Sequence, residues 1–273
     1  YTGNTTTSGA TYYGCSVRRP KVLMSDNGHG LILYHQNQRD PISATIAASS
    51  DSFPNRLWYS TYSVASGFSG ASAAVDTDLI CSSGSFRNDS SVCEGGSSAI
   101  NCQLEREPTS LPLSTTWVDA SLPPIAAAMN VSGNAVIAYH KLYYDSTGTT
   151  CGSLVGVHAV MYDPVNGLGS VTQLDDTTGN TMNANVSINA SGDAAVVWEQ
   201  IVGSSRYVYL RKYSNGVWST QEQMNLGYEA SSDAAMPGVS LSDSNDILIS
   251  FTGNTGAGTT RRQYVRRYKR TKI

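Results

Sequence analysis

A hairpin pattern that recurs four times along the chain constrains the fold more than any other feature of the sequence. Each copy has a strand, then a tight turn rich in Ser, Asn, Gly and Asp, then an apolar strand that closes with an aromatic residue. These turn residues tolerate positive φ or bond their own backbone, so they favour hairpins. The four copies occupy residues 21–36, 126–141, 184–200 and 238–252.

A second hairpin follows the first in three of the copies, at residues 56–69, 157–169 and 206–219. Each repeat therefore supplies four antiparallel strands over about fifty residues. The second strand is apolar on both faces, as at residues 194–198, because a strand covered on both sides loses the alternation of polar and apolar side chains. The sequence thus predicts an all-β fold, a β-propeller of four-stranded antiparallel blades.

The spacing of the repeats predicts the number of blades. The closing aromatic residues are Tyr34, Tyr139, Trp198 and Phe251, and the intervals between them are 105, 59 and 53 residues. We interpret the first interval as two repeats, with a degenerate blade at residues 79–122. A strand from the N-terminal residues, around 11–17, would join the C-terminal blade and close the ring, which removes open sheet edges.

We therefore expect one domain, residues 1–273, with five blades. The alternative is that the chain is part of a larger propeller whose other blades have been removed. The expected blades span residues 20–78, 79–122 (degenerate), 123–180, 181–231, and 232–273 together with 1–19.

The low content of charged residues is typical of a secreted protein. Charged residues make up 14% of the chain, whereas about 25% is usual for soluble proteins. The net charge of −3 gives no reason to bind nucleic acid, and no apolar run approaches the ~18 residues that a transmembrane segment needs. Because the chain begins at Tyr1, we expect a processed protein or a domain of a longer one, extracellular or on the cell surface.

The cysteines predict disulfide bonds rather than a metal site. Cys81, Cys93 and Cys102 are separated by 11 and 8 residues, which matches no CxxC pattern of a zinc site. In an oxidising compartment, these three and Cys151 are the candidates for disulfides. Together with Cys15 the count is odd, so one thiol stays free or pairs between chains. We expect no metal and no cofactor.

One turn resembles the Asp-box of sialidase-type propellers, Ser-x-Asp-x-Gly-x-Thr-Trp. Ser191, Asp193 and Trp198 match it, whereas Ala195 and Val197 replace its Gly and Thr. The Asp-box also lies between the third and fourth strands of a blade, not between the first and second. The whole chain is more similar to the Gly-Asn/Asp propeller repeats of bacterial secreted and surface proteins. That resemblance implies a fold and no particular activity.

The lengths of the loops indicate which side of the propeller binds a ligand. The turns within each hairpin are short, whereas the loops at 37–55 and 142–156 are long and lie on the opposite side. Binding sites tend to occupy variable loops on a rigid scaffold, and aromatic rings beside amide, Arg and carboxylate groups suit sugars. The alternative is that these residues cap blade ends and pack between blades. The predicted ligand-binding residues are Gln36, Arg56, Trp58, His140, Tyr143, Tyr144, Glu199, Arg206 and Tyr207.

No catalytic constellation is recognisable, so we expect no catalytic residues and no enzyme. The chain has no GxSxG nucleophile motif. Asp26, Asp193 and Asp246 recur in the hairpin turns, where we expect them to form turn hydrogen bonds.

The predicted function is an extracellular recognition or adhesion module that binds glycans or other surface molecules. The alternative is a protein–protein scaffold, a homo-oligomer or a fibre-tip assembly domain. A glycoside hydrolase, which would need two facing carboxylates, ranks last.

Overall fold

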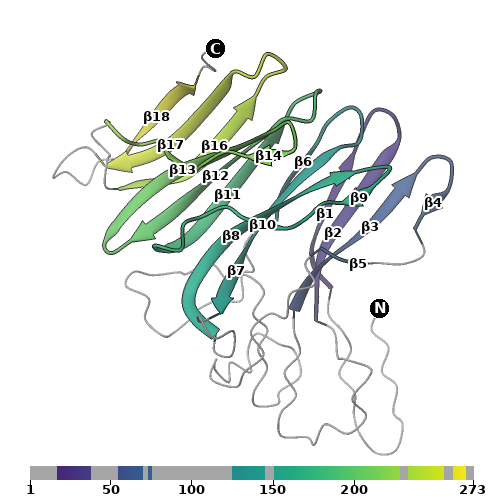
Figure 1. The fold of residues 1–273 in the computed structure, drawn as a ribbon, viewed down its shortest axis with the longest axis horizontal. Coiled ribbons are helices and arrows are strands. Elements are labelled where there is room, and N and C mark those ends of the chain that lie inside the picture. Colours follow the sequence, from purple (N-terminus) through teal and green to yellow (C-terminus); the bar gives the residue numbers. More distant parts are fainter. Residues whose placement is uncertain are drawn as a thin grey trace, which may run out of the picture.

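The structure, a computed structural model, describes residues 17–37, 55–69, 73–75, 125–144, 151–227, 233–254 and 261–268. In these residues it contains β-strands and no helix. The strands form four antiparallel sheets that lie side by side in chain order (Figure 1). The prediction of an all-β protein with the antiparallel blades of a β-propeller is confirmed.

The first three sheets share one plan: three long strands, and a fourth that is broken into two short pieces, both paired with the third. The first sheet contains β1 (Val17–Met24), β2 (His29–Asn37), β3 (Asn55–Ser63), β4 (Gly67–Phe68) and β5 (Ala73–Ala74). The second contains β6 (Ala126–Met129), β7 (Ala135–Tyr144), β8 (Cys151–Asp163), β9 (Gly167–Leu168) and β10 (Thr172–Gln173). The third contains β11 (Asn180–Ile188), β12 (Ala194–Val202), β13 (Ser205–Ser214), β14 (Val217–Trp218) and β15 (Glu222–Gln223).

The fourth sheet has three strands in the described part of the chain: β16 (Ala234–Leu241), β17 (Ile247–Asn254) and β18 (Arg261–Tyr268). Val17, at the end of the segment that we expected to complete this sheet, belongs to β1 of the first sheet. Residues 1–16 lie outside the described residues. The closure of the ring and the count of five blades therefore stay predictions.

Neighbouring sheets are held together by shared hydrophobic clusters. One cluster joins Leu33 of the first sheet to Ile137 of the second. The next joins Val136 to Trp198 of the third sheet, and Phe251 of the fourth sheet belongs to a further cluster with the third. Because Val136 and Ile137 are adjacent and both fully buried, β7 is covered on both faces, as its apolar sequence predicts.

The first and second sheets pack directly on each other through a shared core. Residues 79–122, the expected degenerate blade, lie between these two sheets in the sequence and are outside the described residues. The blade boundaries therefore stay predictions.

The first hairpin of every sheet has the same five-residue turn. The side-chain oxygen of its first residue accepts a hydrogen bond from the backbone N–H four residues later, at 2.9–3.1 Å. Its fourth residue has positive φ, which favours Gly or Asn. The first residues are Ser25, Asn130, Asn189 and Ser242, and the fourth residues are Gly28, Gly133, Gly192 and Asn245.

The carboxylates in these turns do not form the turn hydrogen bonds that we expected. Asp193 and Asp246 stand at the fifth position and contribute their backbone N–H groups. The carboxylate of Asp246 pairs with Arg267 at 2.7 Å, whereas those of Asp26 and Asp193 have no hydrogen bond or ion pair to other described residues. The turn chemistry is therefore that of Asn and Ser, and the Asp-box resemblance stays a prediction.

Asn side chains also link the turns of neighbouring sheets. Asn27 Nδ2 donates to Ser132 O at 3.0 Å, and Asn130 Nδ2 donates to Asn189 O at 2.9 Å. Asn189 Nδ2 in turn donates to Asn245 Oδ1 at 2.7 Å. The turns thus form a hydrogen-bonded layer at one end of the four sheets, which we call the turn side.

Candidate functional site

The structure describes the side chains of five of the nine predicted binding residues: Trp58, His140, Glu199, Arg206 and Tyr207. The other four lie at the ends of strands, Gln36 in β2, Arg56 in β3, and Tyr143 and Tyr144 in β7, and their side chains are outside the described part. The predicted binding surface as a whole stays a prediction.

His140 links the second sheet to the third. Its ring is 2% exposed, Nδ1 lies 2.9 Å from Thr181 Oγ1, and Nε2 accepts a hydrogen bond from the Ala184 N–H at 3.3 Å. Burial lowers the pKa of His140 to about 3, so the ring is neutral. His140 therefore has the packing role that the sequence left open as an alternative.

Glu199 occupies the equivalent position in the third sheet. Its fully buried carboxylate accepts hydrogen bonds from Asn183 Nδ2 at 3.0 Å and from the Met236 N–H of the fourth sheet at 3.3 Å. Its Oε1 also pairs with Arg206 Nη1 at 3.1 Å. Asn183 and Met236 have positive φ and lie where the pairing register of β11 and β16 shifts. Glu199 thus satisfies donors that two β-bulges expose.

The two remaining described residues do not join this group into a cavity. Tyr207 packs against Tyr209 at 6.3 Å between ring centroids. Trp58 lies in the first sheet, opposite Tyr34 of β2, and its Nε1 is buried without a hydrogen-bond partner among the described residues. Of the predicted residues, the structure therefore brings Glu199 and Arg206 into direct contact.

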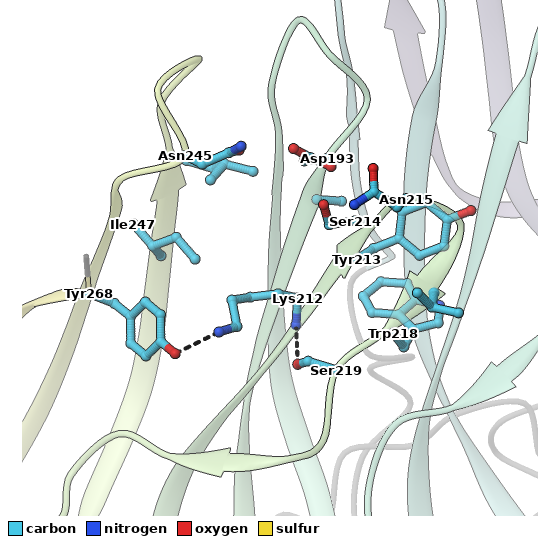
Figure 2. A pocket seen from close by; sticks show the side chains of 13 residues that line it. Asp193, Lys212, Tyr213, Ser214, Asn215, Trp218, Ser219, Asn245, Ile247 and Tyr268 are labelled. Atoms are coloured by element: carbon cyan, nitrogen blue, oxygen red, sulfur yellow. Dashed lines mark hydrogen bonds between the residues drawn. The ribbon is translucent and has the colours of Figure 1, made fainter. Parts of the chain in front are cut away.

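A pocket of about 290 Å³ opens on the turn side, between the third and fourth sheets (Figure 2). Its lining includes Lys212, Tyr213 and Trp218 from the third sheet and Ile247 and Tyr268 from the fourth. The side chains of Tyr213 and Trp218 also pack against the hydrophobic cluster that the third sheet shares with the second. A pocket near 300 Å³ that is lined by aromatic residues and a few polar groups is at the small end of known ligand sites.

Two of the lining residues, Tyr213 and Trp218, form a cross-strand pair. Tyr213 of β13 and Trp218 of β14 are directly opposite each other in the pairing register, and their ring centroids are 5.1 Å apart with planes inclined at 56°. The turn between them has positive φ at Asn215 and Gly216, 53° and 84°, as the type I′ hairpin turn requires. This Asn-Gly turn therefore fixes the two rings beside the pocket.

Lys212 crosses the pocket from β13 to the fourth sheet (Figure 2). Its Nζ donates to the Tyr268 hydroxyl at 2.6 Å and lies 4.0 Å from the centre of that ring. It also pairs with Glu222 Oε1 at 3.0 Å. Burial lowers the pKa of Lys212, but the hydrogen bonds with Tyr268 and Glu222 and the charge of Glu222 outweigh it, so the pKa is raised. The ammonium is charged and already paired.

The rim of the pocket is polar and comes from three turns. Asp193 follows the turn between β11 and β12, Asn215 lies between β13 and β14, and Asn245 lies between β16 and β17. Figure 2 shows Asp193 and Asn215 near each other above the aromatic pair, with Asn245 across the opening. Hydroxyl groups of a ligand would find acceptors and donors here.

The sequence did not predict this pocket, because the loop lengths indicate binding on the opposite side, and that side stays a prediction. The sequence predicted a turn hydrogen bond for Asp193, and it placed Trp218 in the second hairpin, residues 206–219, without a role in binding. The Asn-Gly turn at Asn215 was the available signal, since it predicts that Tyr213 and Trp218 face each other. Nothing in the sequence predicts that Tyr268 of the fourth sheet lines the same pocket.

Other predictions on sites and location remain open. Cys81, Cys93 and Cys102 lie outside the described residues, and Cys151 begins β8 with its side chain undescribed. No group of three or more His, Cys, Asp or Glu side chains that could hold a metal occurs in the described ranges. A search of the same residues finds no helix that is long and apolar enough to span a membrane.

No protein-family model and no curated protein matches the chain. Among solved structures it is similar to the Trypanosoma rangeli sialidase, with 10% identity and a TM-score of 0.41 over 94% of this chain and 37% of that one. An endo-arabinase from Bacteroides thetaiotaomicron has 10% identity and a TM-score of 0.35 over 93% of this chain and 95% of that one. A polysaccharide lyase, an ulvan lyase, has 10% identity and a TM-score of 0.36 over 90% and 68%.

The prediction that the chain is not an enzyme is contradicted by this comparison. Most of the similar structures are enzymes, among them the sialidase, the endo-arabinase and the ulvan lyase. At these identities and TM-scores they assign no reaction and no substrate to this chain. We therefore withdraw the prediction and treat cleavage of a glycan as an outcome to be measured.

Proposed function

We propose that the protein is an extracellular glycan-binding β-propeller and that a sugar binds in the pocket between its third and fourth sheets. The observation that carries the proposal is a pocket whose lining combines aromatic residues, Tyr213, Trp218 and Tyr268, with a polar rim of Asp193, Asn215 and Asn245. An aromatic face packs on the C–H face of a sugar, and fixed polar groups bind its hydroxyls. The pocket, at about 290 Å³, suits one sugar ring of a chain that continues into solvent.

The proposed setting is outside the cell or on its surface, as a recognition or adhesion module. The low fraction of charged residues, 14%, supports this setting because secreted β-proteins commonly replace charge by Ser, Thr, Gly and Asn. A single small site binds a sugar weakly, so several copies of the protein on one surface would raise the overall affinity through avidity.

A glycan array with the full chain tests the proposal, using Trp218→Ala as the pocket variant. The first sheet offers a matched control, because Tyr62 and Phe68 form an equivalent ring pair at 5.0 Å and 55°. We expect Trp218→Ala to abolish detectable binding and Phe68→Ala to retain it. Products are analysed in the same samples, so that cleavage is recorded as well as binding. Equal binding by wild type and Trp218→Ala would overturn the proposal, as would no binding by the wild type.

A further inference from the structure

We propose that the pocket selects uncharged sugars over sugars that carry a carboxylate, because its lysine is already neutralised and its free charge is negative. This inference rests on the proposed function and names the ligand class of the same site. It follows from the charges of two lining residues, Lys212 and Asp193.

Lys212 is not available to a ligand anion. Its Nζ lies 3.0 Å from Glu222 Oε1 and 2.6 Å from the Tyr268 hydroxyl, and that hydroxyl donates to the same Glu222 oxygen at 3.3 Å. The three groups close a triangle of hydrogen bonds. A sugar carboxylate would have to compete with Glu222, which is already in place and part of the folded sheet.

Asp193 supplies the uncompensated charge. Its carboxylate has no hydrogen bond or ion pair to another described residue, and it lies at the rim of the pocket. A carboxylate accepts hydrogen bonds from sugar hydroxyls and repels a second carboxylate at short range. Asn215 and Asn245 are neutral and offer both donors and acceptors. The lining is therefore matched to hydroxyl groups and opposed to an acidic sugar.

Matched pairs of sugars test the selectivity on the full chain. The probes are a galactan oligosaccharide against a galacturonan oligosaccharide of the same length, and a methyl glucoside against the corresponding glucuronide, titrated by calorimetry. In every pair for which binding is detected, we expect the neutral sugar to bind with an affinity at least about tenfold higher than that of the acidic sugar. Equal or tighter binding of the acidic member would overturn the selectivity while leaving the glycan site standing. If no probe binds and the protein also binds no glycan on the array, both the selectivity and the proposed glycan-binding function are overturned.

Two variants test the cause. Glu222→Gln keeps the shape of the side chain but frees the charge of Lys212, so the preference for the neutral sugar should narrow at least about threefold or reverse. Asp193→Asn removes the repelling charge without breaking a contact of the fold, and should narrow the preference as well. Asp163→Asn, which removes one charge from an exposed turn of the second sheet, is the control and should leave the preference unchanged. An unchanged preference in both pocket variants would overturn the proposal.

Discussion

Asn189 of the third sheet donates a hydrogen bond from Nδ2 to Oδ1 of Asn245 in the fourth sheet, across 2.7 Å. The Oδ1 of the same Asn189 accepts the backbone N–H of Asp193 at 2.9 Å. Asp193 and Asn245 both line the pocket. One buried amide therefore closes a turn, joins two sheets and fixes two sides of the proposed binding site.

Replacing Asn189 by Ala should destabilise the protein. The side chain is 3% exposed, and its loss leaves the Asp193 N–H and the Asn245 side chain without these partners. Such losses cost about 1–3 kcal/mol of unfolding free energy. Ser191→Ala, in the exposed part of the same turn, is the matched control and should change less than about 0.5 kcal/mol. Urea unfolding measures both, and equal effects would contradict the role of Asn189.

His140 should make the stability depend on pH. Its pKa is lowered to about 3 in the folded protein from an ordinary value of 6.5, so below pH 6.5 the unfolded chain binds a proton that the folded protein does not. Stability is therefore full above pH 6.5 and falls as the pH decreases. Between pH 7.5 and pH 5, His140 should lower the free energy of unfolding by about 2 kcal/mol.

The variant His140→Gln separates this effect from those of other titrating groups. Its amide keeps hydrogen-bonding capacity beside Thr181 but does not titrate. Urea unfolding at the two pH values should show a smaller loss in the variant than in the wild type. The same loss in both proteins would contradict a buried, neutral His140.

Arg206 and Glu199 should be strongly coupled. Removing Arg206 by Arg206→Ala leaves a fully buried carboxylate with two neutral donors, Asn183 Nδ2 and the Met236 N–H. Because Arg206 itself is 31% exposed, we discount the cost of a broken buried pair to about 1–3 kcal/mol. The double variant Glu199→Gln/Arg206→Ala should be more stable than Arg206→Ala. Additive losses in a double-mutant cycle would show that the pair contributes nothing.

The substitution Gly179→Ala tests how closely the chain just before β11 approaches the backbone of β12. A Cβ at this position would lie 1.9 Å from the carbonyl oxygen of Ile201, so Gly179→Ala forces the backbone to shift and should cost about 3 kcal/mol or more. At Gly169 the nearest heavy atom would lie at an ordinary 3.5 Å, and Gly169→Ala should be tolerated. Thermal unfolding of the two variants decides between these outcomes.

The hairpins could be predicted because their chemistry is local. The turns at Asn130 and Asn189 have the residue types that the geometry requires, and the buried strand that ends at Trp198 shows its burial in its own composition. The β-bulges at Asn183 and Met236 could not be predicted, because Glu199 stabilises them from another strand and another sheet.

Contacts between different sheets were harder to predict from the sequence than the strands themselves. The interval of 105 residues between Tyr34 and Tyr139 predicts an intervening blade, and that blade stays a prediction. The hydrogen bond from Asn27 to Ser132, between the first and second sheets, could not be predicted from this interval. The pocket could not be predicted for a similar reason, since it forms only where the third and fourth sheets pack. The expected glycan ligand, the protein–protein or fibre context and the disulfides stay predictions.

A crystal structure of the full chain with a glycan that binds on the array tests the central claim most directly. The account predicts a sugar ring against Trp218, with hydroxyl groups at Asp193, Asn215 or Asn245. A sugar bound instead at the opposite end of the sheets, beside Trp58 or Arg206, would contradict the pocket and support the binding side that the loop lengths suggested.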